Sequence, residues 1–517
     1  MQIFGMIAFI ILMAISVGLF AIVVYQTRGI VKRVTKVLYL VGELKTILYL
    51  ILGLTLSFTL AIGSIYFWAQ ITPKWYEALV GLLCSALFIC SVSSFYVSFR
   101  LHYYRLDIEK NIDKILYRIM LCSIPVFIIS LWYSFNGFAA YMSYPIANGI
   151  NIPHGITTPD KPASDGVTLA FYALSILSGA LFVYFLCDHK MYQQYGRHGT
   201  LESTFLVAFP SGILGARIWY VIGNWNKEFS GQPFWHVFAI WEGGLTILGG
   251  AIMGIVVGVL WYIWRNKHYS IWVAVDMIVP TILLAQAIGR LGNFFNCEVH
   301  GNPVPISSWS FLPQIILHNG MYSSTDVALT DGTFYLPLFL IEGIINVGGY
   351  FVLAELFGKK LRKFTELGDL AFGYVLVYGI VRAFLEPLRN ANYNMGENGY
   401  WSWVFSCLFI VFGALGIFGN HLVRFLIRRK KGEVKPVNNL FKKSLYSLIG
   451  IGAVALVFIT LAIVFMAGKQ PNLSELVYDL FNVGVMFLCL GGGALLFAGC
   501  SLIYIFETKP KKEVINA

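Results

Sequence analysis

The chain has few charged side chains. Asp, Glu, Lys and Arg account for 12% of its 517 residues, whereas 58% are hydrophobic and the mean hydropathy is +0.72. A soluble domain carries roughly a quarter charged residues, so most of this surface cannot face water. Apolar runs of about eighteen or more residues, enough to cross a bilayer core of about 30 Å as a helix, recur along the chain. These features exclude one large soluble core and predict an all-α, polytopic integral membrane protein.

Two further patterns are missing. The apolar start at residues 1–25 has no basic segment before it and no small-residue cleavage site, so we expect an uncleaved span. The 8 cysteines are scattered, mostly within apolar runs, without the spacing of metal ligands or of a disulfide framework. The histidines are also scattered, and no carboxylates have ligand spacing. We therefore predict no metal and no other cofactor.

Hydropathy, turn residues and charge breaks predict about thirteen membrane helices. They begin near residues 3, 46, 77, 117, 168, 203, 238, 271, 336, 368, 401, 444 and 478. Most of the 37 basic residues fall in alternate connections, for example at 28–45 and 424–443. The opposite connections hold only Lys74, Lys161, Lys227 and Lys469. The positive-inside rule then predicts an N-out, C-in orientation, which explains the net charge of +11 without any nucleic acid.

Four arginines remain within or at the outer ends of predicted helices, namely Arg217, Arg290, Arg382 and Arg389. An arginine at the bilayer centre costs at least about 2.5–3.5 kcal/mol, so it normally faces a partner or a water-filled cavity. The acids available for structural ion pairs are Glu242, Glu298, Glu342 and Glu386. Structural pairing is the favoured interpretation for Arg217, which no motif surrounds. For the other three, the neighbouring residues favour an anion site that opens toward the outside.

The most informative segment lies at 289–298 and reads Gly-Arg-Leu-Gly-Asn-Phe-Phe-Asn-Cys-Glu, with Gly301 three residues on. Arg290, Asn293 and Asn296 recur at i, i+3 and i+6, which places them on one side of a helix. The glycines permit close approach of another backbone or a lipid. A guanidinium fork with two amides can hold a phosphate and ester carbonyls. The residues alone therefore predict a polar anion site in the membrane.

The sequence of this segment closely resembles the signature of the prolipoprotein diacylglyceryl transferase family. Further segments resemble that family in the same order, namely Phe171-Tyr172, Trp241–Leu245 with Gly249-Gly250, Pro337 with Glu342, and Tyr378-Gly379 with Arg382, Glu386 and Arg389. The resemblance covers roughly 166–430, with about seven of the predicted helices. It leaves residues 1–165 as an extension of about four helices, and 431–517 as one of about two helices with basic segments.

The resemblance implies an enzyme of the bacterial cytoplasmic membrane whose site faces the extracytoplasmic side. It would transfer the diacylglyceryl group of phosphatidylglycerol to the lipobox cysteine of a prolipoprotein, forming a thioether and releasing glycerol phosphate. Its partners would be phosphatidylglycerol, prolipoprotein signal peptides and membrane lipids.

Roles for individual residues follow from this reaction. Arg290 and Arg382 would clamp the phosphate, on which charge develops. Arg389 would be a secondary or gating charge. The remaining predicted site residues would bind or orient the substrate or hold the arginines, namely Tyr172, Asn293, Asn296, Gly301, Glu342 and Glu386.

The sequence departs from the family pattern at several positions. Leu248 stands where the family often has a histidine, which removes one candidate base for the substrate thiol. Glu298 is the first alternative, and a thiol pKa lowered by the arginines is the second. Pro387 interrupts the stretch from Arg382 to Arg389, so we expect Arg389 beyond the helix end. A covalent intermediate on Cys297 is disfavoured, because the substrate supplies the thiol.

Two other functions compete with the transferase. A transporter of anionic lipid would usually show an internal repeat or helices broken at the bilayer midplane. No repeat is seen, and the arginines gather on one side. The other alternative is an inactive homologue that serves as a membrane scaffold, in which Leu248 marks lost chemistry. The joint presence of Arg290, Glu298, Glu342 and Arg382 favours the enzyme.

Overall fold

The computed structural model describes most of the chain beyond residue 110. The described residues are 110–142, 171–225, 229–238, 247–266, 269–295, 301–309, 333–389, 400–433, 440–469 and 480–508, with a few positions between 91 and 103. The first three predicted helices lie outside this part, apart from those few positions.

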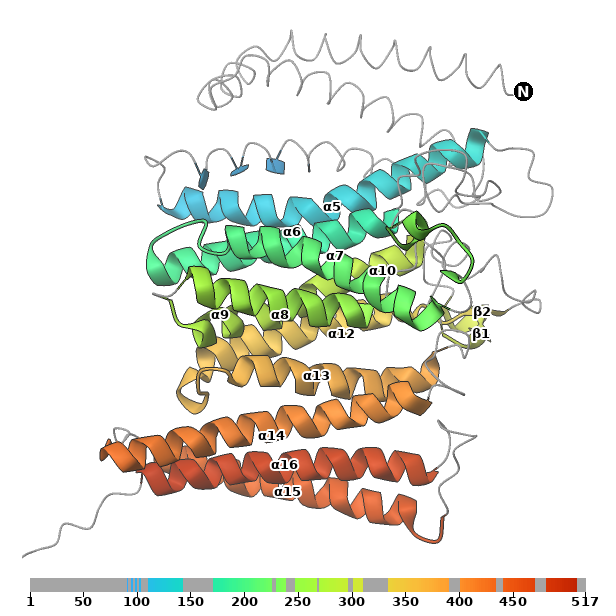
Figure 1. The fold of residues 1–517 in the computed structure, drawn as a ribbon. Coiled ribbons are helices and arrows are strands. Elements are labelled where there is room, and N and C mark those ends of the chain that lie inside the picture. The colour runs from blue at the N-terminus through green and yellow to red at the C-terminus, as the bar shows by residue number, and fades with distance from the viewer. Residues whose placement is uncertain are drawn as a thin grey trace, which may run out of the picture. The chain divides into compact units, whose positions relative to one another are not determined.

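Long helices dominate the described residues (Figure 1). They are α5 (Lys110–Met142), α6 (Phe171–Tyr195), α7 (Glu202–Asn224), α8 (Ile247–Arg265), α9 (Ile271–Ile278), α10 (Ile282–Phe295), α12 (Leu338–Tyr350), α13 (Asp369–Leu385), α14 (Tyr400–Lys431), α15 (Leu440–Met466) and α16 (Leu480–Thr508). The strands β1 (Pro303–Pro305) and β2 (Thr333–Tyr335) form one antiparallel pair. Three short helical turns matter below, namely η3 (Phe234–Phe238), η5 (Val279–Thr281) and η9 (Glu386–Leu388).

Eight helical segments in the described part are long and apolar enough to cross a membrane, and Gly249–Arg265 forms a shorter apolar helix. The prediction of an all-α polytopic membrane protein is therefore confirmed. Three of the segments are composite, and one of them, Asp369–Leu388, joins α13 to η9. Pro280 lies in η5, between α9 and α10, and the segment Ile271–Phe294 nevertheless continues through it. The segment Leu338–Lys360 joins α12 to a π-helical stretch, Phe351–Lys360.

The chain divides into two compact units. Unit 1 comprises Met1–Leu186 and Ile288–Phe339, and unit 2 comprises Cys187–Ala287 and Leu340–Ala517. In unit 1, Tyr117, Met120 and Ile124 of α5 pack with Phe185 of α6. In unit 2, Ala383 of α13, Trp403, Cys407 and Ile410 of α14 and Met486 of α16 form a buried cluster.

Glycines set the closest helix contacts of unit 2. A Cβ at Gly212 of α7 would lie 3.3 Å from the carbonyl oxygen of Gly250 on α8, and one at Gly250 would lie 3.1 Å from that of Gly212. This backbone contact gives the Gly249-Gly250 pair a packing role. Helix α14 packs against both α13 and α16, and α16 also packs against α15 (Figure 1). The last helix therefore lies between α14 and α15.

Candidate active site

Arg382 lies in the last turn of α13 with 8% of its surface exposed. Its Nη2 forms an ion pair with Glu386 one helical turn later, and its Nη1 lies 4.0 Å from Oε2 of Glu342 on α12. Nη2 also donates to the hydroxyl of Ser402 on α14, at 3.4 Å. Three segments that are distant in sequence thus meet at one guanidinium. The structure brings Glu342 and Glu386 to the arginine, as the sequence predicts.

Arg389 lies beyond the end of α13. The helix ends at Leu385, Pro387 follows within the η9 turn, and Arg389 has an extended backbone with φ −79° and ψ 143°. Its Nη1 still lies 3.8 Å from Oε1 of Glu386. The expected position outside the helix is therefore correct, and the i, i+4 relationship holds only for Arg382 and Glu386.

We call the group formed by Arg382, Arg389, Glu342 and Glu386 the charged cluster. Its two positive and two negative formal charges cancel. Arg382, Glu342 and Glu386 are buried, and the side chain of Arg389 is 12% exposed. A guanidinium has five N–H donors, so an arginine that is paired with a carboxylate retains donors for a second anion. Buried carboxylates in such pairs hold the arginine forks in place. The cluster can therefore act as an oriented donor array for a phosphate.

Gly379 explains why Arg382 reaches Ser402. A Cβ at Gly379 would lie 2.7 Å from the backbone nitrogen of Ile410 and 2.8 Å from the carbonyl oxygen of Ser406, both on α14. Only a glycine allows α13 and α14 to approach this closely one turn before Arg382. The neighbouring Tyr378 contacts Phe409 with ring centroids 5.8 Å apart. The Tyr-Gly pair of the motif is thus part of the helix interface.

Arg290 and Asn293 lie on α10, in unit 1. Nη1 of Arg290 donates to Oδ1 of Asn293 at 3.1 Å, which is the i, i+3 contact expected on one helix side. Asn293 is buried, and Phe294 beside it stacks on Phe339 of α12 at 4.6 Å. Arg382 belongs to unit 2.

Gly301 joins two of the motif segments. It is buried, and its backbone N–H donates to the carbonyl of Leu336 at 2.9 Å, while the N–H of Leu336 donates to Asn302 at 3.1 Å. The β1–β2 pair extends this contact by pairing Pro303 with Tyr335. The end of the 289–301 segment is therefore bonded to the residue that precedes Pro337.

Three predicted site residues cannot be placed in this geometry. Asn296 and Glu298 lie outside the described residues. Tyr172 lies in the first turn of α6, and its side chain is outside the described part. Their roles stay predictions.

Arg217 has structural contacts, with backbone carbonyls and an aromatic ring. Its Nε donates to the carbonyl of Val237 at 2.9 Å and its Nη2 to that of His236 at 2.6 Å. Its guanidinium also lies 5.3 Å from the ring centroid of Phe229. These contacts tie the η3 turn to α7.

A second buried network, at the start of α13, was not predicted from the sequence. Asp276 of α9 accepts hydrogen bonds from the backbone N–H of Gly368 at 2.9 Å and of Leu370 at 3.1 Å. Oδ2 of Asp369 lies within hydrogen-bond distance of Nε2 of His421, at 2.6 Å, and its Oδ1 accepts a hydrogen bond from the side-chain amide of Asn420 at 2.8 Å. The one local signal is an acidic residue in the first turn of a helix. This network positions the helix that carries Arg382 at its other end.

Within the described residues, no group of three or more His, Cys, Asp or Glu side chains is arranged to hold a metal ion.

Comparison with known proteins adds to this geometry. Residues 163–419 match the prolipoprotein diacylglyceryl transferase family. A phosphatidylglycerol–prolipoprotein diacylglyceryl transferase of Halalkalibacterium halodurans is 35% identical over 250 residues, which cover 48% of this chain and 81% of the relative. The protein with this name from Clostridium novyi is 34% identical over 257 residues, covering 50% and 93%. That of Clostridium botulinum is 34% identical over 231 residues, covering 45% and 85%. This chain belongs to the prolipoprotein diacylglyceryl transferase family.

Proposed function

We propose that the protein transfers the diacylglyceryl group of phosphatidylglycerol to the lipobox cysteine of a bacterial prolipoprotein. The observation that carries this proposal is the buried cluster of Arg382, Arg389, Glu342 and Glu386 in a membrane-spanning chain of this family. The second support is the Arg290–Asn293 pair in the segment at 289–301. The cluster around Arg382 and the Arg290–Asn293 pair would each supply oriented hydrogen-bond donors for an anionic headgroup.

The transfer is a displacement at the glyceryl carbon that carries the phosphate. The substrate thiolate attacks this carbon, a C–S bond forms, and the C–O bond to the phosphate breaks. The bonding electron pair leaves with the phosphate oxygen, so glycerol phosphate is the leaving group and the peptide product is a thioether. Negative charge builds up on the departing phosphate, and cations oriented toward it lower the barrier. We assign this role to Arg290 and Arg382, with Arg389 as a secondary charge.

The headgroup needs orienting contacts as well as charge. We assign these to Asn293, Asn296 and Tyr172. Because Gly301 has no side chain, the substrate would be able to lie close to its backbone. Glu342 and Glu386 would hold the arginine forks, a role that their contacts with Arg382 support.

The thiol must lose a proton before it attacks, because the thiolate is the nucleophile. We assign the base to Glu298. Glu386 is ion-paired with Arg382 and Arg389, so its carboxylate is assigned to holding these two guanidinium groups. If Glu298 is not the base, the arginines alone would lower the pKa of the substrate thiol.

We further propose the topology and location that the charge pattern predicts. The chain would have about thirteen spans, N-out and C-in, in the bacterial cytoplasmic membrane with the site on the extracytoplasmic side. Its transferase core would be 166–430, with extensions at 1–165 and 431–517.

One assay tests the proposed function. The full chain, purified in detergent, is incubated with phosphatidylglycerol and a synthetic lipobox peptide, and the peptide is analysed by mass spectrometry. We expect the peptide to gain the mass of one diacylglyceryl group, with release of glycerol phosphate. An unmodified peptide would contradict the proposal. Movement of labelled phosphatidylglycerol across vesicles without an adduct would then favour the transporter.

A further inference from the structure

The C-terminal extension packs closely onto the family core. Gly499 of α16 faces Phe418 of α14, where an added Cβ would lie 2.7 Å from the ring. At the same end, Arg428 of α14 bridges Glu366 at 3.0 Å and Glu507 of α16 at 2.7 Å. The match to the family ends at residue 419, so α16 is an addition to the matched region. It forms an extra wall against α14.

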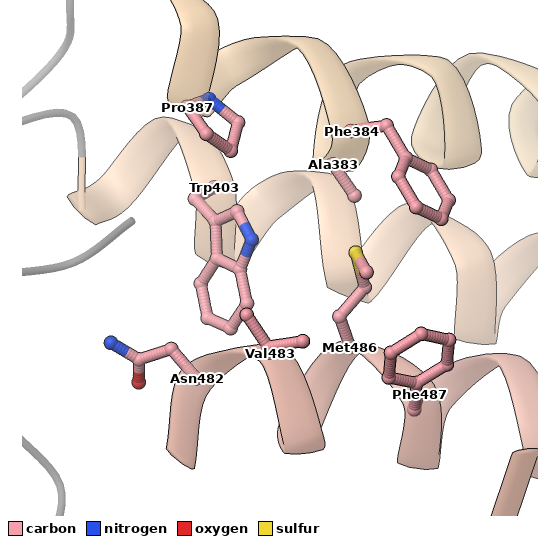
Figure 2. A pocket seen from close by; sticks show the side chains of 8 residues that line it. All are labelled: Ala383, Phe384, Pro387, Trp403, Asn482, Val483, Met486 and Phe487. Atoms are coloured by element: carbon pink, nitrogen blue, oxygen red, sulfur yellow. The ribbon is translucent and has the colours of Figure 1, made fainter. Parts of the chain in front are cut away.

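This wall closes one side of a cavity of about 260 Å³ between α13, α14 and α16 (Figure 2). The core contributes Ala383, Phe384, Pro387 and Trp403, and α16 contributes Asn482, Val483, Met486 and Phe487. The lining side chains are apolar, apart from the amide of Asn482 and the indole N–H of Trp403. Taking about 30 Å³ for a group the size of a water molecule, the cavity has room for roughly nine such groups. This fits part of an acyl chain and is too small for a whole lipid.

The lining is polar at one end only. Figure 2 shows Asn482, Trp403 and Pro387 toward one side of the cavity, and Phe384, Met486 and Phe487 toward the other. Asn482 lies in the first turn of α16, and Trp403 lies in the first turn of α14. Amphipathic Trp side chains are typical of the headgroup level of a membrane, and apolar side chains of its interior. The gradient matches a lipid, whose ester region is polar and whose chain is apolar.

The surroundings of the cavity also favour a lipid. Its three helices are candidate membrane spans, and only 11% of the apolar window of α15, which packs beside α16, is buried. Lipid chains are therefore the solvent around these helices. An apolar cavity excludes water but accepts apolar ligands. Phe384, on the cavity wall, is 46% exposed, so the cavity borders the outer surface of the described helices.

We propose that this cavity binds an acyl chain of a membrane phospholipid, and that α16 completes the binding site. The inference concerns lipid binding and does not depend on the transfer reaction. Arg382 and Glu386 point toward α12 and the start of α14, whereas Ala383, Phe384 and Pro387 line the cavity from the same helix end. The proposed acyl-chain cavity and the charged cluster therefore lie at the same end of α13.

Photochemical labelling tests the proposal. The full-length protein is reconstituted into phosphatidylcholine vesicles that contain phosphatidylglycerol with a diazirine in the middle of one acyl chain. After irradiation, the labelled residues are mapped by mass spectrometry, without any lipobox peptide. We expect adducts on Phe384, Val483 and Phe487 that exceed those on Leu495, which is 52% exposed on α16. Cavity adducts no more frequent than those on Leu495 would overturn the proposal.

Two variants make the test specific. Val483→Phe fills the cavity and should abolish the excess of adducts on Phe384 and Phe487. Leu488→Phe adds a ring on a side chain that is 47% exposed and does not line the cavity, and it should leave the excess unchanged. Equal labelling in both variants would contradict the proposal, provided that both proteins elute as the wild type does. Because no peptide is present, failure of the transfer assay and failure of this labelling are separate outcomes.

A second probe addresses the competing occupant. A lipobox peptide with a diazirine in its apolar segment is irradiated with the protein in unlabelled vesicles. We expect no adducts on Val483 or Phe487. Peptide adducts at these residues that Val483→Phe removes would assign the cavity to the signal peptide and overturn the lipid proposal.

Discussion

Arg382 and Glu386 lie one helical turn apart at the end of α13 and form a buried ion pair. Exposed pairs with the same i, i+4 spacing are worth about 0.3–0.5 kcal/mol, because water screens both charges. The buried pair differs, because the loss of one partner leaves an uncompensated charge in an apolar environment. A pair in this position connects the stability of the helix end with the orientation of the proposed phosphate donors.

Substitution of Glu386 tests this connection. We expect Glu386→Gln to lower the free energy of unfolding by about 3 kcal/mol, because Arg382 and Arg389 lose their shared carboxylate. The measurement is thermal or denaturant unfolding in detergent. The matched control is Glu355→Gln, which breaks the exposed i, i+4 pair with Lys359 at 2.7 Å and should cost about 0.5 kcal/mol or less. Equal losses in the two variants would contradict the structural role.

Arg382→Lys tests the phosphate clamp. Lysine keeps the charge but lacks the planar fork of donors that reaches Glu342, Glu386 and Ser402. We expect kcat/KM of the transfer reaction to fall about 10²-fold or more, as on loss of one preorganised donor. Arg429→Lys, on an exposed position of α14, is the control and should keep full activity. Wild-type activity of Arg382→Lys would refute the clamp assignment for this residue.

Gly379→Ala tests whether helix packing positions Arg382. The added methyl group would meet the backbone of Ile410 at 2.7 Å, so α13 must move away from α14. We expect a loss of about 1–3 kcal/mol in stability together with reduced transfer activity. In Gly419→Ala the new methyl group meets nothing within 4 Å, and both quantities should stay near those of the wild type. An unchanged Gly379→Ala protein would show that the close contact is dispensable.

Glu298→Gln distinguishes the two explanations of thiol activation. If Glu298 is the base, kcat near neutral pH should fall about 10²- to 10⁴-fold. Activity should then rise as the pH approaches about 8.5, because the free thiol deprotonates there without help. The pH–rate profile of Glu202→Gln, which alters an exposed acid of α7, should match the wild type. A wild-type profile for Glu298→Gln would instead favour activation by the arginines alone.

Much of the fold could be predicted because a bilayer imposes simple rules on a sequence. Apolar length predicts where spans lie, and in the described part the predicted starts near 203, 271, 368 and 401 fall within two residues of helix starts at 202, 271, 369 and 400. The predicted starts near 117 and 444 fall several residues after the helix starts at 110 and 440. The composite span through Pro280 shows the limit of this approach. Hydropathy does not reveal that a short 3-10 turn joins α9 to α10.

The candidate site could be predicted only in part. An arginine in an apolar run needs a partner, so sequence spacing correctly placed Glu386 beside Arg382, and Pro387 correctly predicted the position of Arg389. No sequence pattern indicated that Ser402 would reach the same guanidinium, or that Asp276 would cap the start of α13. Both contacts join residues on different helices, with no periodic signal.

The sequence by itself determined the membrane environment, the helix content, the family and the residue types of the proposed anion site, because each follows from composition, local spacing or a contiguous motif. The tertiary structure alone decided which groups share a guanidinium, how closely Gly379 lets α13 approach α14, and where α16 adds a wall to the core. These depend on contacts between helices that lie far apart in the chain, and such contacts are set by side-chain shape in three dimensions.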